Sequence, residues 1–222
     1  MQESEFGKCG VSGLARMVLL EPMLEGGRSL AEAFLLRRTE REFSDAPLPP
    51  QLLSDLLWAA CGINRRNGPF GVAGRTAASA SNSQEVDVYV ALGDGTYWYD
   101  PPRHSLIPIA AGDHRRMALG ARQGAAGSNA PVRLIYVADV GKLEHTAGFE
   151  EPGLHDPEVQ KSYYYVDTGL IAGNVYLFAA SRGLAAWFHN CDRAGLSKAL
   201  GLGDRQRPLF GQTVGYPKRM EP

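Results

Sequence analysis

The chain has few cysteines, and they form no arrangement typical of a disulfide framework or a zinc ribbon. Its three cysteines, Cys9, Cys61 and Cys191, are odd in number and include no C-x-x-C pair. A small disulfide-rich secreted domain is therefore not indicated, and a reducing compartment such as the cytoplasm is expected. The polar start, MQESEFGKCG, lacks the basic and apolar regions of a secretory signal, which agrees with that expectation.

An excess of charge of either sign is also missing. The 222 residues carry 23 Lys and Arg against 24 Asp and Glu, so the formal net charge is −1. A general nucleic-acid binder needs a basic surface, so no nucleic-acid partner is expected. The most apolar stretch, residues 163–180, contains Asp167, Thr168 and Asn174, which favours a buried helix over a membrane span. Any small anion must therefore be bound by a local cluster of cations.

Several signature motifs are absent as well. The sequence contains no G-x-G-x-x-G, no G-x-x-x-x-G-K-[ST], no H-E-x-x-H and no G-x-S-x-G, so a Rossmann site, a P-loop, a zincin and a nucleophile elbow are unsupported. His189 and Cys191 lie two residues apart at a predicted strand end, where they would share one face. Further ligands or a triad partner are missing, but a cysteine hydrolase built on these two residues stays open as an alternative.

The pattern of elements that is present predicts an α+β layered fold. Helices and strands alternate such that residues 24–222 are expected to form one domain, a mixed sheet flanked by helices, after an extended or disordered leader over residues 1–23. Helices are expected from the capping box Ser29–Glu32 to Arg37, over 50–61, from the cap Asp113 to about 123, from Asp156 to Gly183, and over 193–202. Strands are expected over 86–92, 96–99, 106–110, 132–140, 184–189 and 208–216, with loops over 64–84 and 141–155.

Three polar groups could carry chemistry. Arg37, Arg38, Thr39 and Arg41 at a helix end can hold a phosphate, although cations there also complement the helix dipole. The hydroxyl- and amide-rich run Ser79–Gln84 can bind a polar heterocycle, or can simply form a turn. Lys218 and Arg219 add cations after the last strand, where a frayed tail is the alternative. From the residues alone each alternative stays open.

Five segments in register resemble the nitroreductase family of FMN-dependent oxidoreductases. They are R-R-T-E-R with F-S-D-A-P-L (37–48), LLWAACGINR (56–65), RTAASASNSQE (75–85), the central helix with Asp167, Gly169, Asn174 and Gly183-Leu184, and QTVGYPK (212–218). The resemblance covers residues 24–218. It implies an intertwined homodimer with FMN at the subunit interface, and a ping-pong cycle in which NAD(P)H reduces the flavin and a nitroaromatic, a quinone or a related small acceptor is then reduced.

Carried over by position, the resemblance assigns cofactor-binding roles and no catalytic side chain. Arg37, Arg38, Thr39 and Arg41 would hold the phosphate and ribityl chain, and Lys218 and Arg219 would close that site. Ser79, Ala80, Ser81, Asn82 and Gln84 would line the flavin from the partner subunit, and His189 and Asn190 would lie near its ring. Gly169 and Gly173, one turn apart, indicate a close helix seam.

The sequence departs from the family pattern at a few positions. Ala78 stands where the family usually has Pro, Glu40 where it often has a small or apolar residue, and His189-Asn190 are bulkier than usual. Two further alternatives remain within this resemblance. One is a thiazoline or oxazoline peptide dehydrogenase of the SagB type, and the other is a flavin-binding module that has lost turnover.

Overall fold

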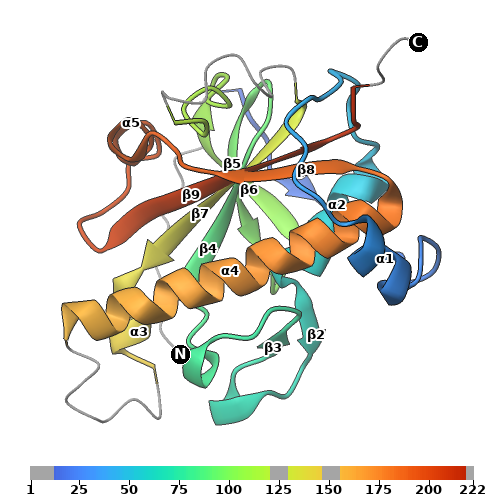
Figure 1. Cartoon of the computed structure of the whole chain (residues 1–222). Helices are drawn as coiled ribbons and strands as arrows, with labels where there is room; N and C mark the ends of the chain where they lie inside the picture. Colours follow the sequence, from blue (N-terminus) through green and yellow to red (C-terminus); the bar gives the residue numbers. More distant parts are fainter. Residues whose placement is uncertain (1–12, 121–129, 147–155, 219–222) are drawn as a thin grey trace.

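The structure is a computed structural model that describes residues 13–120, 130–146 and 156–218 (Figure 1). Its helices are α1 (Leu30–Leu36), α2 (Pro50–Cys61), α3 (Val140–Glu144), α4 (Pro157–Arg182) and α5 (Arg193–Ala199). Its strands are β1 (Met17–Val18), β2 (Ile63–Arg65), β3 (Gly74–Arg75), β4 (Val86–Ala91), β5 (Gly95–Asp100), β6 (Ser105–Ala111), β7 (Val132–Asp139), β8 (Ala185–His189) and β9 (Gln206–Gly215). No helix in these ranges is long and apolar enough to cross a membrane.

The central sheet confirms the α+β class but corrects the expected mixed pairing. Its seven strands follow the order β1-β6-β5-β4-β7-β9-β8, and every described ladder is antiparallel. The connection through α4 does make β7 and β8 run in the same direction. However, β9 lies between them and is antiparallel to both. The order of elements along the chain could not reveal that insertion.

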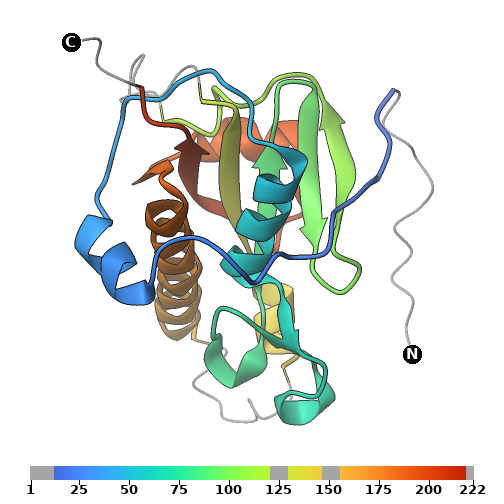
Figure 2. The same ribbon diagram turned by 90° about the vertical axis from the view of Figure 1, so that its right-hand side faces the viewer.

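Helices cover both faces of this sheet. Alternate residues of β7 point to opposite sides: Leu134 shares a buried cluster with Val175 of α4, and Ile135 shares another with Leu196 of α5. Figure 1 shows α4 lying across one face, and Figure 2 shows it standing beside the strands. Because α4 spans the sheet, its residues can contact polar groups at widely separated places on this face.

Local sequence signals set the ends of the helices that position the site. Ser29 and Glu32 form the predicted capping box of α1. Asp156 caps α4 by accepting a hydrogen bond from the Glu158 amide, and Gly183 ends α4 with a left-handed φ of 71°. These predicted boundaries are confirmed, since each depends on residues within one helical turn.

Three loop predictions need correction. Residues 113–120 form turns instead of the start of a helix, because the Met117 carbonyl and the Gly120 amide bond to the backbone of Asp192 and Asn190 instead of continuing a helix. The rest of that predicted helix lies outside the described residues. The expected long loop 64–84 contains the two-stranded β2–β3 hairpin, and α3 occupies part of the expected 141–155 loop.

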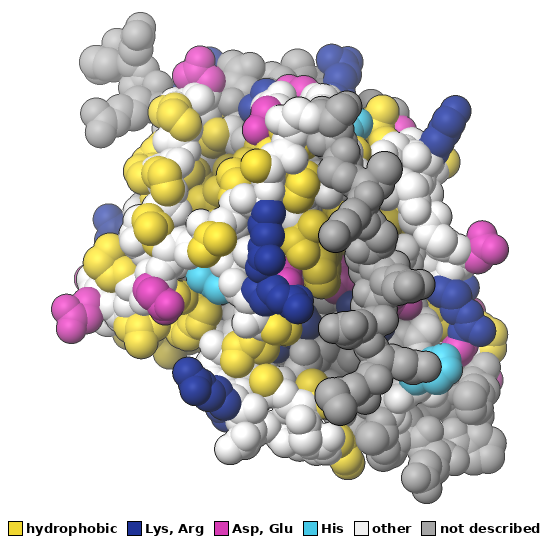
Figure 3. Space-filling model, turned by 180° about the vertical axis from the view of Figure 1, so that it is seen from behind, with side chains coloured by type: hydrophobic (Ala, Val, Ile, Leu, Met, Phe, Trp, Pro, Cys, Tyr) yellow, Lys and Arg dark blue, Asp and Glu magenta, His cyan; other side chains and the backbone are white. Residues whose placement is uncertain are grey.

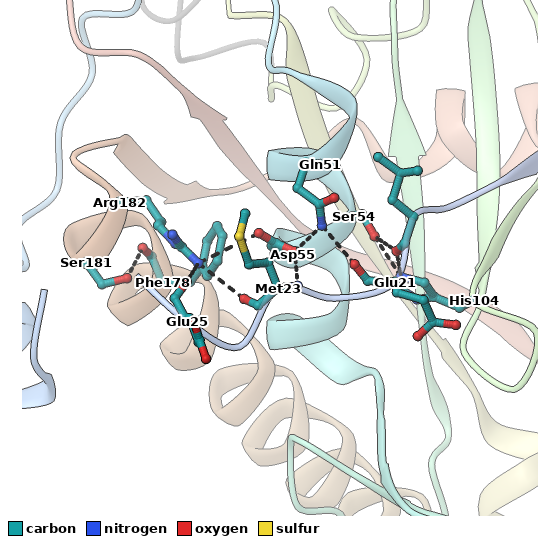
Figure 4. Close-up of polar contacts among 11 residues, drawn as sticks. Glu21, Met23, Glu25, Gln51, Ser54, Asp55, His104, Phe178, Ser181 and Arg182 are labelled. Carbon is teal, nitrogen blue, oxygen red and sulfur yellow. Dashed lines mark hydrogen bonds and ion pairs between the residues drawn. The ribbon is translucent and has the colours of Figure 1, made fainter. Parts of the chain in front are cut away.

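The segment 19–28 crosses α2 as an extended strap. The Met23 amide donates to the Asp55 carboxylate at 2.8 Å, and the Arg182 guanidinium at the end of α4 donates to the Glu25 carbonyl at 3.2 Å (Figure 4). Just before the strap, β1 pairs with β6. The strap therefore ties the end of α4 to α2 beside the first helix.

Candidate functional site

The segment after α1 and the segment after β9 meet beside β8. The Glu40 amide donates to the Ala186 carbonyl at 3.0 Å, and the Lys218 amide donates to the Glu42 carbonyl at 3.1 Å. The segment after α1 is thus held between β8 and the residues that follow β9. This contact brings the segment of the predicted cations Arg37–Arg41 close to Lys218. A shared anion site requires such closeness. Arg219 lies outside the described residues.

We call Arg37, Arg38, Arg41 and Lys218 together the cation end. Its arginines differ in their partners. The Arg37 guanidinium lies over the Tyr176 ring, 5.6 Å from its centre, and Arg41 lies over the Trp187 ring at 5.5 Å. Neither has a carboxylate partner among the described ion pairs, whereas Arg38 is paired with Glu40. Arg37 and Arg41 therefore suit an anion, and the unusual Glu40 neutralises Arg38.

Tyr176 of α4 is a site residue that sequence reasoning missed. Its phenol oxygen lies 3.1 Å from Thr39 Oγ1 and accepts a hydrogen bond from the Phe188 amide at 2.8 Å. The same side chain thus orders Thr39, the face under Arg37 and the backbone of β8. An aromatic residue inside an apolar helix gave no signal of this role, because the pattern could not show which strand it meets.

The second group, which we call the loop end, is the docked turn Ser79–Gln84. Ser81, Asn82 and Gln84 all have left-handed φ values, 47°, 57° and 53°. Asn82 Nδ2 donates to the Val72 carbonyl at 3.1 Å and Gln84 Nε2 to the Ala73 carbonyl at 2.6 Å. These amide side chains hold the turn against the β2–β3 hairpin. Contacts within the protein offset the backbone strain of three non-glycine residues.

A buried carboxyl pair supports the loop end from below. The Ala80 amide donates to Asp167 Oδ2 at 3.0 Å, and Asp167 interacts with Glu85. Asp167 is 4% exposed and Glu85 is 0% exposed. Burial, followed by the neighbouring Glu85 charge, raises the pKa of Asp167 to about 7. Sequence reasoning named Asp167 only as part of a motif and missed Glu85 as its partner.

The cation end and the loop end do not meet within one protomer. Asp167 and Tyr176 both belong to α4, and their separation along the helix is about 14 Å at 1.5 Å per residue. The predicted phosphate cluster and the predicted flavin loop are therefore two separate half-sites on one chain.

The His189 region is engaged inside the sheet. His189 is 5% exposed, and its ring nitrogens lie 2.8 Å from Thr213 Oγ1 and 2.9 Å from the Asn190 carbonyl. Burial lowers the pKa of His189 to about 4 and raises that of the Cys191 thiol to about 11. Both groups are thus neutral near pH 7, which argues against the cysteine hydrolase. Asn190 is exposed. Within the described ranges, no group of three potential ligands could hold a metal ion.

Surface charge is dispersed on the face turned away from α4. Figure 3 shows Lys and Arg side chains there scattered among acidic, apolar and polar ones. The described residues of this view form no continuous basic field, in keeping with the balanced composition.

The fold is α+β, and its candidate site combines the cation end with a strained loop that contacts two buried acids. Comparison with known proteins identifies the family. The sequence model of the nitroreductase family matches residues 35–216. The chain therefore belongs to the nitroreductase family.

Individual relatives agree with this placement. A protein of Methanocaldococcus jannaschii that carries a provisional nitroreductase name is 31% identical over 162 residues, which is 70% of this chain and 75% of that protein. A crystal structure from Ralstonia eutropha JMP134, also provisionally named a nitroreductase, has a TM-score of 0.78 and 35% identity, covering 92% of this chain and 90% of the other. The NADPH:FMN oxidoreductase of Vibrio harveyi shares the fold with a TM-score of 0.58 and 20% identity, covering 87% and 72%.

Proposed function

We propose that this protein is an FMN-dependent oxidoreductase that uses NAD(P)H to reduce a nitroaromatic, a quinone or a related small acceptor. Membership of the nitroreductase family and the fold shared with an NADPH:FMN oxidoreductase support the class of reaction. The observation that carries the proposal is the backbone contact between Lys218 and Glu42, which joins the segment of Arg37–Arg41 to that of Lys218 beside β8. When bound, FMN would supply the hydride transfer.

The residues present fit the chemistry of FMN. Its phosphate would be held at the cation end by Arg37 and Arg41, which have no carboxylate partner in the described part of the chain, with Lys218 beside them. Arg38, already paired with Glu40, would contribute less. Thr39 would meet the ribityl chain, since Tyr176 fixes its hydroxyl.

The loop end would line the ring with its backbone and with Ser79 and Ser81, because the Asn82 and Gln84 amides already hold the hairpin. Asn190 is exposed and remains a candidate ring contact. The His189 imidazole is left out, since both of its nitrogens are occupied.

The site would be shared between two copies of the chain. Within one protomer the two half-sites are separate along α4, and the family resemblance places the loop end of one copy at the flavin held by the cation end of the other. Exposed apolar side chains lie on α1 and α4: Phe34 of α1 is 62% exposed, and Val166 and Leu170 of α4 are 60% and 44% exposed. A Cβ at Gly169 or Gly173 would meet nothing within 4 Å, which leaves room for a second helix. These features support the homodimer that the family resemblance implies.

A visible absorption spectrum tests the proposed cofactor. The purified protein, incubated with FMN and freed of excess, is expected to show flavin bands that bleach on anaerobic addition of NADPH or NADH and return with nitrofurazone or a quinone. A protein that stays colourless after FMN loading contradicts the proposal. Flavin bands that no nicotinamide bleaches indicate the module without turnover. Oxidation of an azoline peptide, with no nitrofurazone reduction, indicates the peptide dehydrogenase.

A further inference from the structure

A small cavity lies under the Ser79–Gln84 loop, and two carboxyl groups face it. Its lining includes Cys61 of α2, Arg75 of β3, Ser79, Glu85 and Asp167. Glu85 directly follows the loop, and Asp167 comes from the middle of α4. The cavity thus joins the loop, the hairpin and two helices around one pair of acids.

The hydrogen bonds of this pair leave one oxygen without a donor. Glu85 Oε2 accepts from the Ser83 hydroxyl, and Asp167 Oδ2 accepts from the Ala80 amide. Glu85 Oε1 is buried and has no hydrogen-bond partner within the described ranges. A buried acceptor without a donor is unfavourable, and two adjacent ionised carboxylates repel each other. A single proton held between Asp167 and Glu85 removes both penalties.

The surrounding charges do not neutralise the pair. Arg75 is the other charged residue in the described lining of the cavity, and Lys142 of α3 lines a neighbouring hollow with Arg75 and Ser83. Arg75 forms no ion pair with either acid, and Lys142 is bound to both Asp87 oxygens at 2.6 and 2.7 Å. The Cys61 thiol is neutral, because burial raises its pKa to about 11. The shared proton is therefore the available compensation.

We propose that Asp167 is a positioning residue, and that the proton it shares with Glu85 clamps the Ser79–Gln84 loop in its strained conformation. The clamp acts at both ends of the loop: Asp167 holds the Ala80 amide, and Glu85 holds the Ser83 hydroxyl. Loss of the proton sets two carboxylates against each other directly beneath three left-handed residues. The consequence for flavin affinity rests on the proposed function, whereas the clamp itself does not.

The direction of the pH effect follows from the raised pKa of Asp167 in the clamped state. The clamped loop binds the proton more tightly than the open loop, where Asp167 returns toward its ordinary value near 3.8. The clamp is therefore fully stable below about pH 4, weakens as pH rises to about 7, and has no further dependence above that. Opening should increase about tenfold per pH unit inside this window at most.

Amide hydrogen exchange of the FMN-free protein tests the clamp without using the cofactor. After correction for the intrinsic pH dependence of exchange, opening of residues 79–84 is expected to rise at least about tenfold from pH 5 to pH 7 and then level. In D167N the new amide accepts from Ala80 and donates to Glu85 without titrating. That variant is expected to stay protected, with a flat pH profile.

Matched variants and a control segment make the result decisive. E85Q is expected to flatten the profile as D167N does, while Asp167→Ala exposes the loop at every pH. Protection of β6, residues 105–111, is expected to be the same in all three, which separates the clamp from global unfolding. A flat profile in the natural protein, or an unchanged slope in D167N, overturns the clamp. Flavin titrations on the same samples judge the proposed function separately: a pH-dependent loop in a protein that binds no FMN leaves the clamp standing.

Discussion

The cation end and the loop end are both packed against α4, through Tyr176 and Asp167, but they hold opposite kinds of polar group. At the cation end, Arg37 and Arg41 are exposed and lie over aromatic rings. At the loop end, Asp167 and Glu85 are buried and support a strained turn. Exposed guanidiniums keep their charge whatever the fold does, whereas buried carboxyls owe their protonation to the fold. α4 thus supports exposed cations through Tyr176 and carries a buried acid, Asp167, whose protonation depends on the fold.

The largest expected effect comes from breaking the dimer that would join the two ends. Gly169→Leu meets open space within the protomer, and it favours the helix by about 1 kcal/mol. Across the proposed interface the new side chain blocks the partner helix. We expect the dimer dissociation constant to rise at least about 100-fold in sedimentation experiments, an effect of about 2.7 kcal/mol. FMN affinity should fall with it, since each site would need one end from each copy.

The control for that variant is Ser162→Leu, an exposed position nearer the start of α4. It adds the same side chain to the same helix without touching the Gly169–Gly173 seam, and it should leave the dimer intact. A Gly169→Leu protein that sediments as the natural one does contradicts a seam at this position, whatever its flavin content.

The next largest effect distinguishes the cation end from the loop end by comparing the binding of FMN with that of riboflavin. Arg37→Ala removes a cation with no carboxylate partner among the described ion pairs, so it should weaken FMN about 10- to 100-fold through one lost charged hydrogen bond, roughly 1.5–3 kcal/mol. Riboflavin lacks the phosphate, and its affinity should stay within about twofold of the natural value. Fluorescence titration of both ligands measures the difference.

Arg207→Ala is the matched control, because Arg207 is an exposed arginine on β9 away from the cation end. It should change neither titration. Equal weakening of FMN and riboflavin by Arg37→Ala would place Arg37 at the ring or in the fold, and not at the phosphate. That result would remove the distinction between the two ends.

The cation end was the more predictable half because its signals are local. Arg37, Arg38 and Arg41 follow a capped helix whose boundaries depend on neighbouring residues. Even so, the sequence could not show that Glu40 forms an ion pair with Arg38 or that the Tyr176 ring lies beneath Arg37. Those contacts cross from the loop after α1 to α4, and no spacing rule connects them.

The loop end and the sheet order depended on contacts between distant segments. Glu85 and Asp167 become partners only when α4 packs beside β4, so neither reads as an acid pair in the sequence. The mixed sheet was wrong for the same reason, since β9, the last strand in the sequence, lies between β7 and β8 and is antiparallel to both. The Asp113 helix was wrong for a similar reason, because the backbone of Met117 and Gly120 bonds to residues 190–192.

The smallest expected effect tests whether strain is confined to the loop end. Ser81 has a φ of 47°, and its side chain makes no hydrogen bond among the described contacts. Glycine adopts this conformation without steric cost, so Ser81→Gly should stabilise the protein by about 0.5–1 kcal/mol. For a chain of this size that corresponds to a rise in melting temperature of roughly 1–4 °C. Ala80→Gly, one residue earlier and outside the left-handed region, should do the reverse, because it only adds backbone freedom to the unfolded chain. Opposite signs in differential scanning calorimetry would assign the strain to Ser81, and a loss of stability in both would mean that the loop is relaxed and needs no clamp to hold its shape.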